Sequence, residues 1–143
     1  MAYPTPDAPT RRTPGTSTLE HSFRPHHRMK SARDFARAYR HGSRARGAIL
    51  RVVVVPNGLE HTRLGLSVGR VIWRSAVRRN RVRRIFREAF RLERHGLPSG
   101  IDVVLIPAEK GLDPTLERTR SELVSLVAKA WRRHGEKAAT EDA

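Results

Sequence analysis

The sequence predicts one small domain of mixed α and β structure, α/β or α+β, in which a small mixed sheet is flanked by helices. Three observations support this prediction. The chain has 143 residues, a length at which a single core is the rule. Apolar residues alternate with a period of two in some stretches and recur at helical spacing in others. Residues 63–106 give a strand, a helix and a strand in turn, the pattern of a β-α-β unit with parallel strands.

The first predicted element is a short helix between Ser31 and Gly42. Ser31 can cap its start, and Phe35 and Tyr39 recur at helical spacing. Gly42 can end the helix in a left-handed conformation.

Two strands are predicted next. Residues 49–55 are rich in valine and stop at the turn signal Pro-Asn-Gly of residues 56–58. Residues 63–69 alternate strictly, so the second strand has one apolar face and one nearly bare face. The bare face carries Gly65, Ser67 and Gly69.

A long helix, a buried strand and a last helix complete the order α-β-β-α-β-α. The long helix begins after Ser75 and ends before Gly96, and residues 101–106 form the strand. Asp113 can cap the last helix, with proline at its first position. The predicted core stripe of that helix is Leu116, Leu123, Val124, Val127, Ala130 and Trp131.

Two tails flank this domain. Residues 1–22 are rich in proline, threonine and serine without a hydrophobic period, which predicts a disordered basic arm. Residues 135–143 are small and charged, which predicts a disordered tail. The single domain is therefore expected at residues 23–134.

The chain is strongly basic. Its 29 lysine and arginine residues against 14 aspartate and glutamate residues give a formal net charge of +15, and 25 of the 29 are arginine. Guanidinium groups are always charged and bind phosphate through paired hydrogen bonds, so this composition favours a polyanionic partner such as RNA. A codon bias toward arginine explains part of the arginine-to-lysine ratio but not the net charge.

The composition also excludes several classes of protein. The chain has no cysteine, which excludes disulfides, thiolate metal sites and cysteine nucleophiles. No apolar run approaches the roughly 20 residues that cross a bilayer, and no signal segment opens the sequence, so we expect a cytoplasmic protein without a membrane partner. Hydrolytic motifs and paired carboxylates are missing, so we predict neither catalytic residues nor a metal site in this chain.

The charge is concentrated between residues 70 and 94, where ten arginines stand against two glutamates. On the long helix most of these arginines form one broad face beside the apolar stripe, with Arg81 on the other flank. A solvated surface is the alternative, but solvated helices usually pair opposite charges at four-residue spacing. We therefore favour RNA binding by Arg79, Asn80, Arg81, Arg83, Arg84, Arg87 and Arg91. Asn80 has three possible partners here: a base edge, a 2′-hydroxyl or the backbone.

The bare strand face suggests a second binding surface. Its small residues leave room for an extended phosphate backbone, and Phe35 and Tyr39 offer stacking surfaces beside it. The alternative is that both aromatic residues only dock the first helix on the sheet.

Two segments give the chain a resemblance to the protein subunit of bacterial ribonuclease P. They are Arg-Leu-Gly-Leu-Ser-Val-Gly at residues 63–69 and Ala-Val-Arg-Arg-Asn-Arg-Val-Arg-Arg-Ile-Phe-Arg-Glu-Ala-Phe at residues 76–90. The resemblance covers about residues 26–133. Two features depart from the pattern: the loop before the second segment is one residue longer and carries Trp73, and lysine is common where Arg83 stands.

The resemblance implies a fold and a function. The fold has an uncommon left-handed β-α-β crossover, against the strong right-handed rule. Catalysis in this family belongs to a large RNA subunit that uses Mg²⁺. The protein binds that RNA and holds the 5′ leader of precursor tRNA, so no small-molecule substrate is expected.

The same resemblance assigns the candidate residues to two surfaces. The arginine-rich set named above, from Arg79 to Arg91, would face the catalytic RNA. The leader cleft would be formed by Phe35, Tyr39, Arg51, Gly65, Ser67 and Gly69. An alternative function is that of a ribosomal or ribosome-associated RNA-binding protein. A DNA-binding regulator would need a helix-turn-helix or a symmetric dimer surface, and neither is visible.

Overall fold

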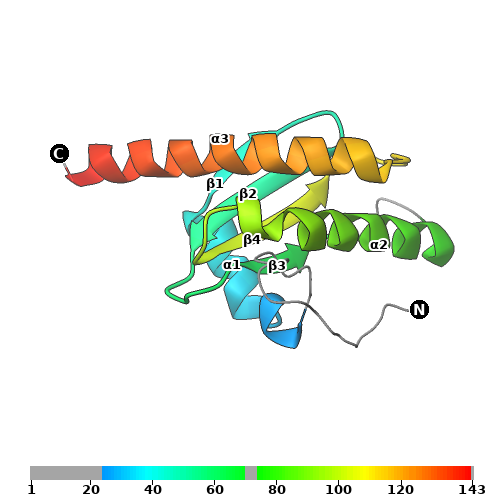
Figure 1. Ribbon diagram of the computed structural model, residues 1–143, viewed down its shortest axis with the longest axis horizontal. Coiled ribbons are helices and arrows are strands. Elements are labelled where there is room, and N and C mark those ends of the chain that lie inside the picture. Colours follow the sequence, from blue (N-terminus) through cyan, green and yellow to red (C-terminus); the bar gives the residue numbers. More distant parts are fainter. Residues whose placement is uncertain (1–23, 70–73, 143) are drawn as a thin grey trace, which may run out of the picture.

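A four-stranded sheet lies at the centre of the computed structural model, which describes residues 24–69 and 74–142 (Figure 1). The predicted N-terminal arm and Trp73 lie outside the described residues. The strand order is β1-β2-β4-β3. The strands are β1 (Ser43–Arg46), β2 (Leu50–Pro56), β3 (Arg63–Leu66) and β4 (Ile101–Pro107).

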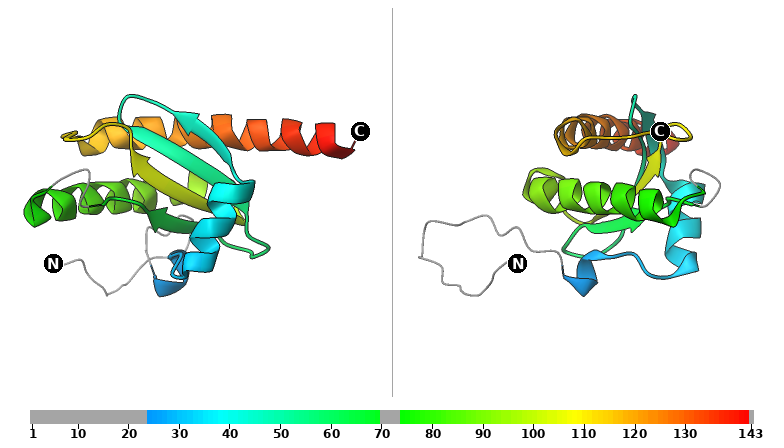
Figure 2. Two further views of the ribbon diagram at one scale, coloured as in Figure 1. Left: turned by 180° about the vertical axis from the view of Figure 1, so that it is seen from behind. Right: turned by 90° about the vertical axis from the view of Figure 1, so that its right-hand side faces the viewer.

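Three α-helices cover the sheet unequally. Helices α2 (Ala76–Glu93) and α3 (Leu116–Asp142) lie on one face, and the short α1 (Ala32–His41) lies on the other (Figure 2). Two 3₁₀ turns, η1 (Pro25–His27) and η2 (Arg94–Gly96), precede α1 and follow α2. None of the described helices combines the length and apolarity that a membrane span requires.

The β3–α2–β4 unit is parallel, as predicted, and the other strand pairs are antiparallel. With α2 in front of the sheet, as in Figure 1, β3 and β4 both run to the right and β4 lies above β3. This arrangement makes the crossover left-handed. The mixed α+β fold expected from the resemblance is therefore confirmed.

The larger hydrophobic core lies between the sheet and the α2–α3 layer. Alternate residues of β2, such as Val52 and Val54, meet Phe86 and Phe90 of α2 and Leu123 of α3 in this core, all of them fully or almost fully buried. A smaller cluster lies on the opposite face, where α1 packs on Val53, Val55 and Val104. The period of two along β2 therefore assigns successive residues to two different cores.

Two sequence predictions need correction at their ends. The strand at residues 63–69 ends at Leu66, although the amide of Ser67 still donates to the Leu105 carbonyl. Gly42 ends α1 in an extended conformation (φ −80°) rather than a left-handed one. Glycine is needed there because a Cβ atom would lie 2.5 Å from the Ala38 carbonyl oxygen.

The edge strand β1 was not predicted from the sequence. Its residues, Ser-Arg-Ala-Arg, are not β-branched, so local preference gives no strand signal. Tertiary contacts supply what propensity lacks, since the Glu122 carboxylate of α3 accepts the backbone N–H groups of Ala48, Ile49 and Leu50 at 2.9–3.0 Å. This carboxylate fixes the turn that joins β1 to β2.

Helix α3 differs most from its prediction. It begins at Leu116 after a Thr115 cap, not after Asp113, because the Thr115 hydroxyl accepts the Arg118 N–H at 3.3 Å. It also runs to Asp142, although a disordered tail was predicted from residue 135. The helix continues there because alanine, lysine and glutamate favour helical structure. Val124 and Trp131 are 39% and 36% exposed, not core, because the helical period places them on the flank of the buried stripe of Leu123, Val127 and Ala130.

Candidate nucleic-acid interface

Helix α2 presents its arginines on the side away from the larger core. Ser75 caps the helix by accepting the Arg78 N–H, as predicted. Val82, Phe86 and Phe90 bury one side in the core. The helical period leaves the positions between them for arginine, so the charged face follows directly from the apolar stripe.

Three neighbouring arginines on this face, Arg83, Arg84 and Arg87, have no ion pair with a carboxylate among the described residues. Arg83 donates instead to the Val68 carbonyl at 2.9 Å, which ties α2 to the segment after β3. Burial, together with the charges of Arg28, Arg83 and Arg84, lowers the pKa of Arg87. Arginine stays charged at neutral pH, so the lowered pKa marks a guanidinium that is partly buried and surrounded by other cations.

Other members of the predicted set have protein partners. Arg91 binds Glu88 through two hydrogen bonds, and Arg81 lies 3.4 Å from Asp113 in an exposed ion pair. Arg79 donates to the Arg74 carbonyl at the start of the helix. Asn80 is exposed and accepts a long hydrogen bond of 3.5 Å from Arg83.

A pocket of about 220 Å³ joins the arginine face to the cleft predicted on the other side of β3. Its walls come from the segment before α1, from α1, from the edge strand β3 and from α2. The lining residues are Arg28, Met29, Phe35, Leu64, Leu66, Arg83 and Arg87. Two residue sets that were predicted separately, one on α2 and one on α1, thus meet in one hollow.

A second hollow, of about 200 Å³, lies on the α1 face of the sheet. Arg51 lines it, together with Arg44, Arg46 and Arg133, above a floor that includes Val53 and Ile106. In the sheet register Arg46, Arg51 and Ile106 lie side by side. This part of the face carries cations above an apolar floor.

The remaining predicted cleft residues differ in how far they are exposed to solvent. Tyr39 packs half-buried on the smaller core, and Ser67 is half-buried just past β3. Gly65 is buried rather than bare, because Phe35 and Met29 cover it. Gly69 is exposed and outside the strand.

Comparison with known proteins identifies the family. The family model described as ribonuclease P matches residues 23–131. The chain belongs to the ribonuclease P protein family. The ribonuclease P protein component of Syntrophobacter fumaroxidans (strain DSM 10017 / MPOB) is 36% identical over 112 residues, which cover 77% of this chain and 93% of that protein.

Solved structures of ribonuclease P proteins share the fold. The protein from Thermotoga maritima is 30% identical, with a TM-score of 0.63 over 71% of this chain and 96% of its own. The protein from Staphylococcus aureus is 28% identical, with a TM-score of 0.63 over 73% of this chain and 94% of its own. This chain is therefore a subunit of the ribonucleoprotein that processes tRNA 5′ ends, and the ribosomal alternative is not favoured.

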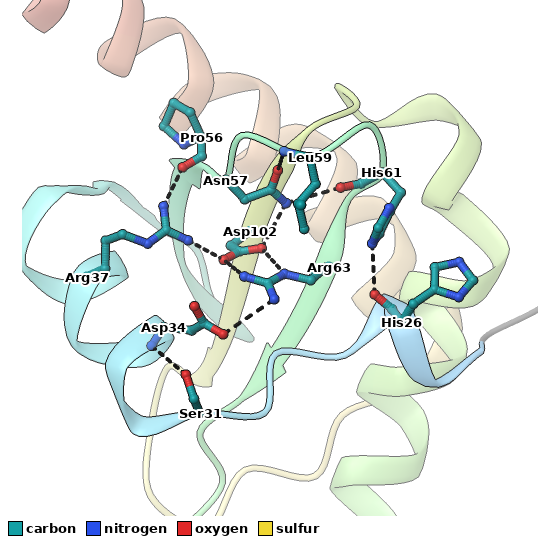
Figure 3. A network of polar contacts seen from close by, with 10 residues as sticks. All are labelled: His26, Ser31, Asp34, Arg37, Pro56, Asn57, Leu59, His61, Arg63 and Asp102. Carbon is teal, nitrogen blue, oxygen red and sulfur yellow. Dashed lines mark hydrogen bonds and ion pairs between the residues drawn. The ribbon is translucent and has the colours of Figure 1, made fainter.

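A polar network in this ribonuclease P protein was missed in the sequence. Asp102 of β4 is fully buried and binds Arg37 of α1 and Arg63 of β3 (Figure 3). The available signal was the acid itself, since a carboxylate within a buried apolar strand needs a cationic partner.

Proposed function

We propose that this protein binds the catalytic RNA of ribonuclease P through α2 and guides the 5′ leader of precursor tRNA across the α1 face of the sheet. The single observation that supports this most is the shared pocket beside β3. Arg83 and Arg87 on one wall suit phosphate, and Phe35 on another suits a base. A single strand that follows this pocket would contact both kinds of group, the combination typical of single-strand binding sites.

The open part of the sheet continues this path. Arg46 and Arg51 project from adjacent strands over Val53 and Ile106, and Ser67 follows β3 at the other edge. Cations beside an apolar floor suit an unpaired nucleotide chain, because phosphates and bases can be bound on the same surface. The proposed leader cleft is therefore formed by Phe35, Tyr39, Arg51, Gly65, Ser67 and Gly69, with Gly65 admitting Phe35 rather than touching RNA.

We assign the bond-breaking step to the RNA partner. Within residues 24–69 and 74–142, no group of three histidine, aspartate or glutamate side chains is arranged so that it could hold a metal ion. These residues do not fit a protein-held Mg²⁺ site, so the proposal places the Mg²⁺ ions on the RNA. Precursor tRNA is the proposed substrate, and the cytoplasm the proposed location.

Reconstitution tests this function. The purified protein is mixed with ribonuclease P RNA and Mg²⁺, and we expect it to stimulate removal of the leader from a precursor tRNA. The affinities of this complex of protein and RNA, the holoenzyme, for precursor tRNA and for mature tRNA are then measured. We expect Phe35→Ala to weaken binding of the precursor more than binding of the mature product, because only the precursor has a leader.

Trp131→Ala is the matched control, since Trp131 is a partly exposed aromatic residue on α3. It should leave the ratio of the two affinities unchanged. Equal losses for both RNAs with Phe35→Ala would show that Phe35 is only a packing residue. Failure to stimulate cleavage would contradict the proposed function as a whole.

A further inference from the structure

A buried carboxylate joins three parts of the α1 face of the sheet. Asp102 has no exposed surface and accepts hydrogen bonds from Arg37, Asn57 and Arg63 at 2.7–2.9 Å. Arg63 binds both carboxylate oxygens from the neighbouring strand. Arg37 reaches the same carboxylate from α1, so one side chain of the sheet holds a strand, a loop and a helix (Figure 3).

Two further contacts fix α1 at this point. The second nitrogen of the Arg37 guanidinium donates to the Pro56 carbonyl at 2.6 Å, and Arg63 lies 3.3 Å from Asp34 at the start of α1. Although burial alone would raise it, the pKa of Asp34 is lowered by the charge of Arg63. Two acids and two arginines therefore balance in charge, which a buried ionic cluster requires.

The network and the proposed cleft lie on opposite flanks of α1. Residues of a helix advance by about 100° per position, so Ala38, which faces the sheet, lies between two sides. Phe35 and Tyr39 occupy one side, and Asp34 and Arg37 occupy the other. The Arg37 and Asp34 contacts therefore resist rotation of α1 about its own axis, and that rotation would move Phe35 and Tyr39 relative to the sheet.

Helix α1 has few other anchors. It has ten residues, and Ala38 is its one buried side chain. Phe35 lies directly over Gly65, where an added Cβ atom would come within 2.9 Å of the ring. A small shift of α1 would therefore change the contact that shapes the pocket beside β3.

We propose that Arg37, held by Asp102, is a positioning residue that sets the orientation of Phe35 and Tyr39 for leader binding. This inference rests on the proposed leader cleft. Arg37 acts through α1, not by contact with RNA, because its guanidinium is engaged by Asp102 and Pro56. Its charge therefore adds little attraction for phosphate.

Arg37→Met tests the proposal, because it removes the link to α1 while Arg63 still pairs with Asp102. In the reconstituted holoenzyme, we expect the ratio of precursor to mature tRNA affinity to fall roughly three- to tenfold. Such a loss corresponds to part of the binding free energy that one stacked base contributes. Mature tRNA binding should stay constant. The slope of log affinity against log salt should also stay constant, whereas loss of a phosphate contact would reduce it by about 0.7.

Arg33→Met is the matched control. Arg33 lies one turn earlier on the same side of α1, carries the same charge and is exposed. It should leave the affinity ratio unchanged. Arg37→Lys should restore part of the ratio, because an ammonium group can keep one of the two contacts.

The outcomes separate this inference from the function on which it rests. If the ratio of precursor to mature tRNA affinity falls with Phe35→Ala but not with Arg37→Met, the positioning role of Arg37 is overturned and the proposed leader cleft stands. A ratio unaffected by Phe35→Ala overturns the cleft itself. Equal loss with Arg33→Met and Arg37→Met, or a loss of unfolding free energy without any change in the ratio, also overturns the positioning role.

Discussion

Unpaired and paired arginines on α2 should differ in how they respond to salt. Arg84 and Arg87 have no carboxylate partner among the described residues, whereas Arg81 and Arg91 each have one. Arg84→Ala/Arg87→Ala and Arg81→Ala/Arg91→Ala remove the same formal charge from the same helix. A comparison of the two double variants therefore separates phosphate contacts from net charge.

The size of the effect follows from counterion release. Each lost phosphate contact lowers the salt slope by about 0.7 for single strands and about 0.9 for duplex. Two lost contacts in Arg84→Ala/Arg87→Ala should lower it by about 1.4 to 1.8. Between about 50 and 200 mM salt, the affinity difference from the unchanged protein should shrink roughly tenfold.

The assay is binding of the protein to ribonuclease P RNA at several salt concentrations with Mg²⁺ held constant. Arg81→Ala/Arg91→Ala should give a smaller change in slope, because those guanidinium groups already have carboxylate partners. Equal slopes for the two variants would refute the argument that pairing within the protein decides which arginines bind RNA.

Three further predictions concern stability and packing. Glu122→Gln should lower the free energy of unfolding by about 1–3 kcal/mol, because three charge-assisted hydrogen bonds weaken; an unchanged urea midpoint would contradict this. Burial and nearby charges, Arg94 first, lower the pKa of His27 from 6.5 to about 4. The folded state thus binds fewer protons between those values, and stability should fall by about 2 kcal/mol from pH 7 to pH 5. Urea unfolding of His27→Asn should show a smaller pH dependence, and an equal one would assign the effect to other groups. Gly65→Ala should cost about 1–3 kcal/mol and weaken precursor binding, since its Cβ atom would lie 2.7 Å from the Met29 sulfur and displace Phe35; intact stability and affinity would show that both side chains move freely.

Local signals were sufficient for most of the fold. The valine run of β2, the Ser31 and Ser75 caps and the apolar stripe of α2 each determine structure through neighbours in sequence. For that reason the predicted helices α1 and α2 and the strands β2 and β4 lie where expected. The arginine face could be predicted for the same reason, since it is the complement of a stripe that the helical period defines.

Elements that depend on distant residues could not be predicted in this way. The turn beside β1 is held by Glu122, more than seventy residues away. The ion pair of Arg81 with Asp113 joins α2 to the segment before α3 and has no local signature. The sequence does not distinguish a packing role from an RNA-stacking role for Phe35. The structure gives the reason, because the ring both covers Gly65 and lines the pocket.

Because the helices cover the two faces of the sheet unequally, residues on the more open face can be substituted without disturbing the larger core. Val52 and Val54 of β2 enter the larger core, whereas Arg51, the residue before Val52, points to the opposite face and is exposed. One strand thus contributes to the core through Val52 and Val54 and, in the proposed function, to RNA binding through Arg51. On the proposed leader path, variation at Arg46, Arg51 or Ser67 would alter which strand of RNA is accepted, while the opposite side of the sheet would continue to specify the same architecture.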